Sequence, residues 1–141
     1  MFGKLSIIGC GLIGSSILRA VQEKKLASKI SVYDNSNRVT EYLKKNFSVD
    51  ICYNLSATVK DADLIIISAP LSSYKEILLS IKPNLKEGSI LTDTGSAKKE
   101  VNKIVNNLGF KNISWIASHP IAGTEHSGCL LYTSPSPRDV P

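Results

Sequence analysis

The sequence predicts an α/β domain whose doubly wound, mostly parallel sheet carries helices on both faces. Short apolar segments of strand length alternate with longer segments that repeat apolar residues at helical spacing. The apolar run at 64–69 is continuous, as expected of a parallel strand that is buried on both faces. The length of 141 residues suits one domain.

The first half of the chain alternates between the two kinds of segment. It predicts strands at 4–8, 30–33 and 50–53 and helices at 12–26 and 38–47. One face of the first helix is apolar, with Ile13, Ile17, Leu18 and Val21. The second helix is expected to turn three side chains inward: Val39, Tyr42 and Leu43.

The second half continues the alternation with strands at 64–69, 89–92 and 113–117. Pro70 ends the first of these strands, and Ser73 and Glu76 have capping-box spacing at the start of the next helix. The stripe of that helix consists of Ile77, Leu78, Ile81 and Leu85. A last helix carries Val101, Ile104, Val105 and Leu108 and is expected to end at Gly109.

The composition excludes several classes of function. The net charge is +5, but the paired lysines are expected on polar helix faces. Aromatic residues make up only 6% and do not alternate with basic ones. Both observations argue against binding of nucleic acid. The paired lysines are Lys24, Lys25, Lys44, Lys45, Lys98 and Lys99. We find no membrane span, no secretory signal and no metal-ligand spacing among the three cysteines, so we expect a cytoplasmic protein without a metal.

Five residues fall at predicted carboxyl ends of strands: Gly9, Asp34, Pro70, Asp93 and His119. In doubly wound sheets, ligands bind beyond the carboxyl ends of the strands. We therefore expect these five residues to border a single crevice.

The sequence GCGLIG, near the start of the chain, matches G-x-G-x-x-G between a predicted strand and a predicted helix. There Gly9 permits a tight turn, Gly11 lets the backbone approach a pyrophosphate, and Gly14 lets helix and strand pack closely. Leu12 and Ile13 open the helix, whose free amides and positive dipole end suit phosphates. The pattern favours a Rossmann-type dinucleotide site over an ordinary glycine turn.

Asp34 lies 20 residues after Gly14, where a carboxylate can accept hydrogen bonds from the adenosine ribose and repel a 2′-phosphate. This favours NAD, although the nearby Arg38 leaves NADP possible. Asp34 could instead be a turn residue or a helix cap. Ser68, Ala69 and Pro70 are expected beside the nicotinamide-side ribose, or are a plain strand end.

Three motifs carry a resemblance to a known family. They are GCGLIG, TDTGSAK at Thr92 to Lys98, and HPIAGTEHSG at His119 to Gly128. Over residues 4–128 the chain resembles the N-terminal nucleotide-binding domain of the prephenate and arogenate dehydrogenases of tyrosine biosynthesis. The histidine string is the most specific of the three motifs.

The resemblance implies NAD-dependent oxidative decarboxylation of prephenate or arogenate. His119 matches the catalytic histidine, which accepts the hydroxyl proton as hydride leaves for the nicotinamide. Ser96 matches a serine near that hydroxyl, although it could also cap the next helix. Glu125 matches a glutamate near the substrate, and Gly123 is expected to let the backbone pass close to the ligand.

Other residues of these motifs are given smaller roles. Asp93 and Lys98 are expected to shape the turn and cap the helix rather than to do chemistry. His126 is interpreted as a solvated loop residue without a role. Gly128, like Gly123, is expected to allow a close backbone approach to the ligand.

The family's substrate-binding arginine and its dimer contacts come from a C-terminal helical domain, which we expect to be absent from this chain. The resemblance therefore implies a homodimer only for a longer protein. Two alternatives stay open. One is another two-domain NAD(P) dehydrogenase, of the β-hydroxyacid or imine reductase type. The other is a dinucleotide-binding module without catalysis.

The last residues differ in composition from the rest. Residues 129–139 read CLLYTSPSPRD and resemble the conceptual translation of a transposase adapter used in sequencing libraries. We expect the dinucleotide-binding domain to span 1–128 and residues 129–141 to be a non-native tail. The alternative is a genuine disordered tail rich in serine and proline.

Overall fold

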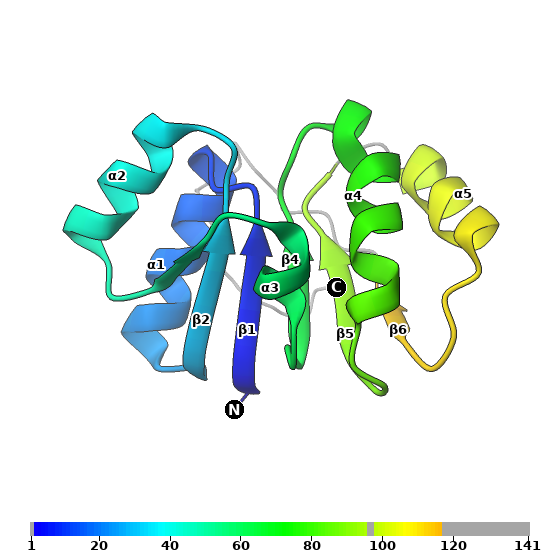
Figure 1. The fold of residues 1–141 in the computed structure, drawn as a ribbon, viewed down its shortest axis with the longest axis horizontal. Coiled ribbons are helices and arrows are strands. Elements are labelled where there is room, and N and C mark those ends of the chain that lie inside the picture. Colours follow the sequence, from blue (N-terminus) through cyan, green and yellow to red (C-terminus); the bar gives the residue numbers. More distant parts are fainter. Residues whose placement is uncertain (1, 96–97, 117–141) are drawn as a thin grey trace.

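The computed structural model describes residues 2–95 and 98–116, which form a six-stranded parallel sheet with helices on both faces (Figure 1). The strands are β1 (Phe2–Ile8), β2 (Ala27–Tyr33), β3 (Asp50–Cys52), β4 (Leu64–Ile67), β5 (Ile90–Asp93) and β6 (Ser114–Ile116). The helices are α1 (Leu12–Lys24), α2 (Asn37–Asn46), α3 (Leu55–Val59), α4 (Tyr74–Ile81) and α5 (Lys98–Leu108). The predicted fold class is confirmed.

The strand order is β3-β2-β1-β4-β5-β6, so the chain starts in the middle of the sheet and builds outward in both directions. Leu5 of β1 pairs with Ile30 of β2 on one side and with Leu64 of β4 on the other. The order therefore reverses between β1 and β4, and such a switch point is where doubly wound sheets bind ligands.

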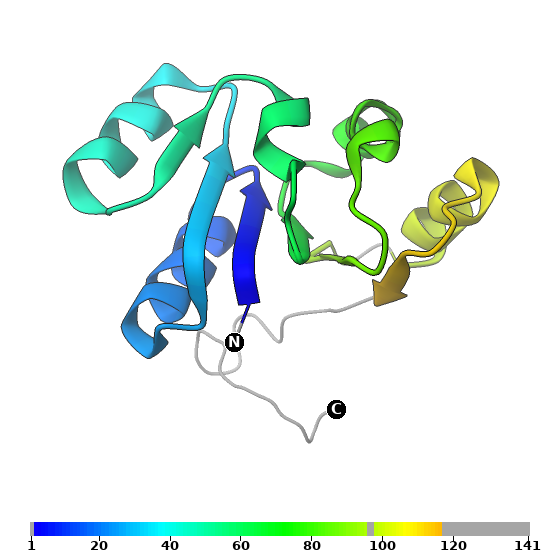
Figure 2. The same ribbon diagram turned by 60° about the horizontal axis from the view of Figure 1, so that its bottom comes forward.

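Two apolar cores lie on opposite faces of the sheet because neighbouring residues of a strand point to opposite sides. Ile8 belongs to the core beneath α3, α4 and α5, whereas Ile7 belongs to the core beneath α1 and α2. In β4, Ile65 and Ile67 face the first core and Ile66 faces the second. Figure 2 shows α1 on one side of the strands and α3 and α4 on the other.

Several predicted boundaries are wrong by one to three residues. The first helix ends at Lys24 rather than at residue 26, because Lys25 adopts a left-handed conformation (φ 53°) and reverses the chain. The second strand then begins at Ala27, which pairs with Phe2, and not at residue 30. The strand beginning at Leu64 ends at Ile67 rather than at residue 69, although the Ser68 amide still donates to the Ile8 carbonyl at 2.8 Å.

Two other expectations also fail, and one helix was not predicted. Tyr42 is 46% exposed and packs edge-on against Phe47, while Thr40 takes the buried place beside Leu43. Ile13, expected on the buried face, is 36% exposed near the start of its helix. Helix α3, five residues long and capped by Asn54, follows the third strand without being predicted.

The capping box predicted at Ser73 does not form. A 3₁₀ turn (Leu71–Ser73) precedes α4, and the Ser73 backbone is already helical there, so its side chain accepts no capping hydrogen bond. Gly109, in contrast, has the positive φ (64°) predicted for the residue after the last helix.

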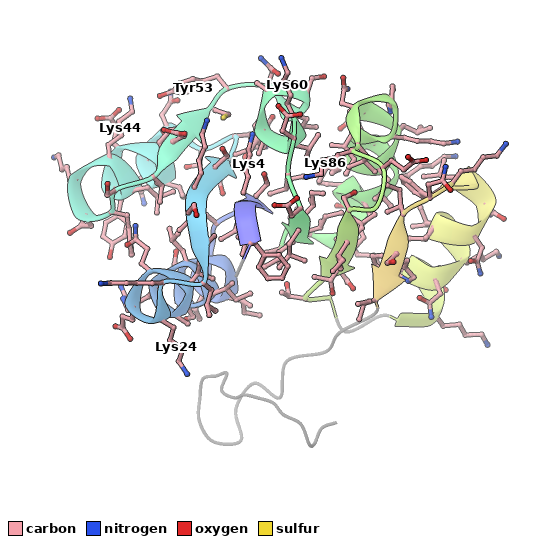
Figure 3. The ribbon with its side chains drawn as sticks, turned by 90° about the horizontal axis from the view of Figure 1, so that it is seen from below. Lys4, Lys24, Lys44, Tyr53, Lys60 and Lys86 are labelled. Carbon is pink, nitrogen blue, oxygen red and sulfur yellow. The ribbon has the colours of Figure 1, made fainter. Side chains whose placement is uncertain are left out.

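The paired lysines whose side chains the structure describes are exposed, as expected of solvated helix faces. Seen from the amino-terminal ends of the strands, Lys24 lies well apart from Lys44 and Lys60 (Figure 3). Within residues 2–95 and 98–116, no helix combines the length and hydropathy that crossing a membrane requires.

Candidate dinucleotide site

The parallel register brings four strand ends into one row at the carboxyl edge of the sheet. Ile8 pairs with Tyr33 on one side and with Ile67 on the other, and Ile67 pairs with Asp93. The residues that follow these pairs therefore emerge side by side, at the upper edge in Figure 1. The structure thus gathers the glycine turn, Asp34, the segment after β4 and the end of β5, as predicted.

The glycine turn is packed so closely that two of its glycines leave no room for a side chain. Gly9 has φ +87° and donates its amide to the Tyr33 carbonyl at 2.7 Å. A Cβ at Gly9 would lie 2.9 Å from the Ala69 nitrogen, and one at Gly14 would lie 2.5 Å from the Gly9 carbonyl oxygen. These contacts seat the start of α1 directly against the ends of β1 and β4.

Gly11 differs from the other two glycines because a Cβ there would meet no atom within 4 Å. It is the N-cap residue of α1, and no side chain caps this helix. The first amides of a helix have no partner within the helix and carry the positive end of its dipole. The surface at Gly11 is therefore an open backbone cradle that fits a pyrophosphate.

Asp34 follows β2 and connects two loops at this edge. Its Oδ2 accepts a hydrogen bond from the Cys10 amide at 2.7 Å, and its Oδ1 accepts one from the Ser36 amide at 2.9 Å. Each carboxylate oxygen keeps a further lone pair, so both can still accept from ribose hydroxyls. Ser36, not Asp34, caps α2, and Arg38 is exposed in the first turn of that helix.

Cys10 lies within the glycine turn but faces inward. It is 2% exposed, and its Sγ lies 3.8 Å from the Ser15 hydroxyl. Burial raises the pKa of the Cys10 thiol to about 11, with the Asp34 carboxylate adding to the effect. The thiol is therefore protonated at neutral pH, and the contribution of Cys10 to the site is its backbone amide.

The ends of β4 and β5 are joined by a pair of hydroxyl groups. The Thr94 hydroxyl lies 3.1 Å from the Ser68 hydroxyl, and the Thr94 amide donates to the Ile67 carbonyl at 3.0 Å. Ala69 packs beneath Gly9, and Pro70 is exposed at the start of the 3₁₀ turn. Sequence reasoning missed Thr94, although a hydroxyl residue directly after a strand-ending aspartate was a signal that could have found it.

Other sequence-predicted residues lie outside the described part of the chain. These are Ser96, His119, Gly123, Glu125, His126, Gly128 and the tail, together with the side chain of Lys98. Two shallow hollows, of about 670 and 550 Å³, lie around β2 and β3 and contain none of the predicted site residues. Among the described residues, no group of three His, Cys, Asp or Glu side chains could hold a metal ion.

Comparison with known proteins identifies a family. Residues 17–134 match the family model described as prephenate dehydrogenase, nucleotide-binding domain. A cyclohexadienyl dehydrogenase from Zymomonas mobilis is 33% identical over 91% of this chain and 44% of its own length. A prephenate dehydrogenase from Lactococcus lactis is 35% identical over 90% of this chain and 36% of its own length.

Solved structures agree on the fold. A prephenate dehydrogenase from A. aeolicus, in complex with hydroxyphenyl propionate and NAD+, superposes with a TM-score of 0.68 at 21% identity. That superposition covers 91% of this chain and 45% of the other. The chain therefore spans less than half the length of these relatives.

Proposed function

Because the chain belongs to the prephenate dehydrogenase family through its nucleotide-binding domain, we propose that it forms the dinucleotide-binding part of an NAD-dependent prephenate or arogenate dehydrogenase. The observation that carries the proposal is the open backbone cradle at Gly11, beside the carboxylate of Asp34. Such a cradle at a switch point suits a dinucleotide. An NAD+ complex of a structural neighbour agrees with it.

In the proposed binding mode, Gly11, Leu12 and Ile13 present backbone amides to the pyrophosphate. Asp34 accepts hydrogen bonds from the adenosine ribose, and its charge disfavours the 2′-phosphate of NADP. Ser68, Ala69 and Pro70 border the nicotinamide-side ribose. Bound NAD would supply the hydride acceptor.

In the proposed reaction, His119 accepts the proton of the substrate hydroxyl through a neutral imidazole. Ser96 donates a hydrogen bond near the same hydroxyl, and Glu125 and Gly123 contact the substrate. As the carbinol carbon loses hydride, its hydroxyl proton becomes acidic and the hydroxyl becomes a carbonyl. Carbon dioxide then leaves, and the electron pair of the broken C–C bond passes through the ring to the carbonyl oxygen, which gives an aromatic phenolate. The protein then mainly has to hold these groups in place.

The assembly and location of the protein are further parts of the proposal. A full-length protein that contains this chain would dimerise through a helical C-terminal domain, which would also bind the substrate carboxylates. The described cysteines, Cys10 and Cys52, are both free, which suits a reducing cytoplasm.

Two measurements test the function. A full-length protein that contains this chain is expected to form NADH from NAD with prephenate or arogenate. The His119→Asn variant should keep the Kd for NAD within about twofold but lose turnover by at least about 100-fold. No NADH with either substrate, or unchanged turnover of the variant, would contradict the proposal.

The second candidate is a binding module without catalysis, because the open backbone at Gly11 and the carboxylate of Asp34 account for dinucleotide binding without any catalytic group. Titration of the 141-residue chain with NAD and NADP, followed by Trp115 fluorescence, tests the binding that both candidates require, and the turnover of a longer protein separates them. The module reading requires tight NAD binding together with no turnover in any longer protein that carries this chain.

A further inference from the structure

A buried hydrogen bond lies behind the turn that follows β5. The Tyr74 hydroxyl, on the first residue of α4, donates to Asp93 Oδ2 at 3.0 Å. Tyr74 is 1% exposed and Asp93 is fully buried. Burial and the neighbouring carboxylate raise the pKa of the Tyr74 hydroxyl, so it stays a protonated donor at neutral pH.

The same carboxylate oxygen holds the backbone of the turn. The Gly95 amide donates to Asp93 Oδ2 at 2.8 Å, so the tyrosine hydroxyl and the glycine amide converge on one atom. A Cβ at Gly95 would lie 2.9 Å from both Asp93 Oδ2 and the Tyr74 hydroxyl oxygen. Only glycine therefore fits at position 95 without a steric clash with Tyr74 and Asp93.

Thr94 fixes the other side of the turn. Its amide donates to the Ile67 carbonyl at the end of β4, and its hydroxyl contacts Ser68 in the crevice. Thr94 and Gly95, the two residues directly before Ser96, thus each donate a backbone hydrogen bond, Thr94 to the strand-end carbonyl of Ile67 and Gly95 to the buried carboxylate of Asp93. A charged hydrogen bond in the interior is stronger than a neutral one and costs more when one partner is lost.

We propose that Tyr74 and Asp93 are positioning residues that fix the backbone of Thr94 and Gly95 at the crevice, and that turnover depends on this turn because Ser96 follows it directly in the sequence. The inference rests on the substrate role proposed above for Ser96. Tyr74 touches no reacting group and acts only through the carboxylate and the Gly95 backbone. Removal of its hydroxyl should loosen the turn while leaving the glycine cradle intact.

The Tyr74→Phe variant tests this because phenylalanine keeps the ring in the core and removes only the hydroxyl. In a full-length protein that contains this chain, we expect kcat to fall about 10-fold, as a small misplacement of a catalytic group does. The Kd for NAD should stay within about twofold. Tyr42→Phe, which removes an exposed hydroxyl, is the matched control and should leave kcat unchanged.

A double-mutant cycle separates positioning from general stability. If Tyr74 acts through Ser96, the Tyr74→Phe change should have no further effect on kcat in a Ser96→Ala background. Losses that multiply, or a Tyr74→Phe variant with the kcat of the parent, would overturn the inference. A Ser96→Ala variant with full kcat would overturn it as well.

A second arm uses the 141-residue chain and needs no activity. Amide hydrogen exchange of Gly95, measured by NMR, should rise at least about 10-fold in Tyr74→Phe and stay unchanged in Tyr42→Phe. Should Tyr74→Phe not fold, Gly95→Ala perturbs the same turn, because its methyl group would press against Asp93 Oδ2 and the Tyr74 hydroxyl, and it should reproduce the kcat loss. Unchanged Gly95 exchange overturns the inference.

The two arms keep this inference distinct from the proposed function. A wild-type protein that forms no NADH with prephenate or arogenate would refute the function. The exchange measurement would then still decide whether Tyr74 and Asp93 hold the turn.

Discussion

The carboxylate of Asp34 accepts a hydrogen bond from the Cys10 amide at 2.7 Å, which ties the end of β2 to the glycine turn after β1. The residue proposed to select the ribose is thus itself held by the loop proposed to hold the phosphates. Its second oxygen is held by Ser36. The carboxylate is therefore oriented before any dinucleotide arrives.

The charge of Asp34 is expected to set the preference for NAD over NADP. Asp34→Asn keeps an oxygen that can accept from Cys10 but removes the charge that repels a 2′-phosphate. We expect the ratio of the Kd values for NADP and NAD to shift by about 10-fold toward NADP, or about 1.4 kcal/mol. Titrations of both nucleotides, followed by tryptophan fluorescence, measure this ratio.

The control for that experiment is Asp50→Asn. Asp50 is an exposed aspartate 3.6 Å from Lys29, on the third strand and away from the crevice. Its removal should leave the ratio unchanged. An equal shift in both variants would mean that overall charge, and not Asp34, sets the preference.

Two glycines of the turn should separate binding from folding. Gly11→Ala adds a methyl group to open space, so we expect an unchanged Tm and a Kd for NAD at least about 10-fold higher. Gly14→Ala places a methyl group 2.5 Å from the Gly9 carbonyl oxygen and should cost about 1–3 kcal/mol of stability. Thermal unfolding and NAD titration check both. A Gly11→Ala variant that binds NAD normally would refute the cradle.

The thiol of Cys10 should resist alkylation in the folded chain. With a pKa of about 11, only about one thiol in a thousand is ionised at pH 8, and the group is buried. In a Cys129→Ser background, iodoacetamide should modify the half-buried Cys52 first and reach Cys10 only in urea. Peptide mass spectrometry follows both sites, and equal rates in the native chain would contradict the buried geometry.

Asp63 lies at the amino-terminal edge of the sheet, opposite the crevice, and should make the free energy of unfolding depend on pH. The Lys86 ammonium, with the Lys4 and Gly3 amides, lowers the pKa of the Asp63 carboxyl (Lys86 and Lys4 are labelled in Figure 3). A depressed folded-state pKa stabilises the fold above the unfolded-state value, about 3.9, and this contribution is lost as the pH falls through the folded-state value.

Urea midpoints of the parent and of Asp63→Asn, measured from pH 7 downward, test that linkage. The parent should be more stable at pH 7, and the difference should close as the pH falls below about 4. Asp61→Asn is the control, because Asp61 is exposed and has the left-handed φ (61°) that asparagine tolerates. A difference between parent and Asp63→Asn that is constant with pH would contradict the assignment.

The sequence predicted the sheet and its crevice because both depend on short-range patterns. Alternating apolar segments identified all six described strands, and the spacing of Gly9 to Gly14 located the turn that the structure confirms. Parallel strands place their carboxyl ends on one edge, so Asp34 and Pro70 could be assigned to the crevice without any knowledge of strand order.

What the sequence did not predict depends on tertiary contacts. The bond between Tyr74 and Asp93 spans 19 residues, and no spacing rule connects them. Helix α3 is too short to show a helical period. The exposure of Tyr42 follows from where α2 begins and from its contact with Phe47, not from its apolar character.

The position of β1 in the middle of the sheet has a consequence during synthesis. On a ribosome, β1 can pair with β2 early, but its other edge must wait until Leu64 emerges to meet Leu5. Until then the nascent chain exposes an unpaired apolar strand, a template on which a second chain can add. Slow translation between the second and fourth strands would prolong that interval, and a chaperone that shields this edge should raise the yield of folded protein.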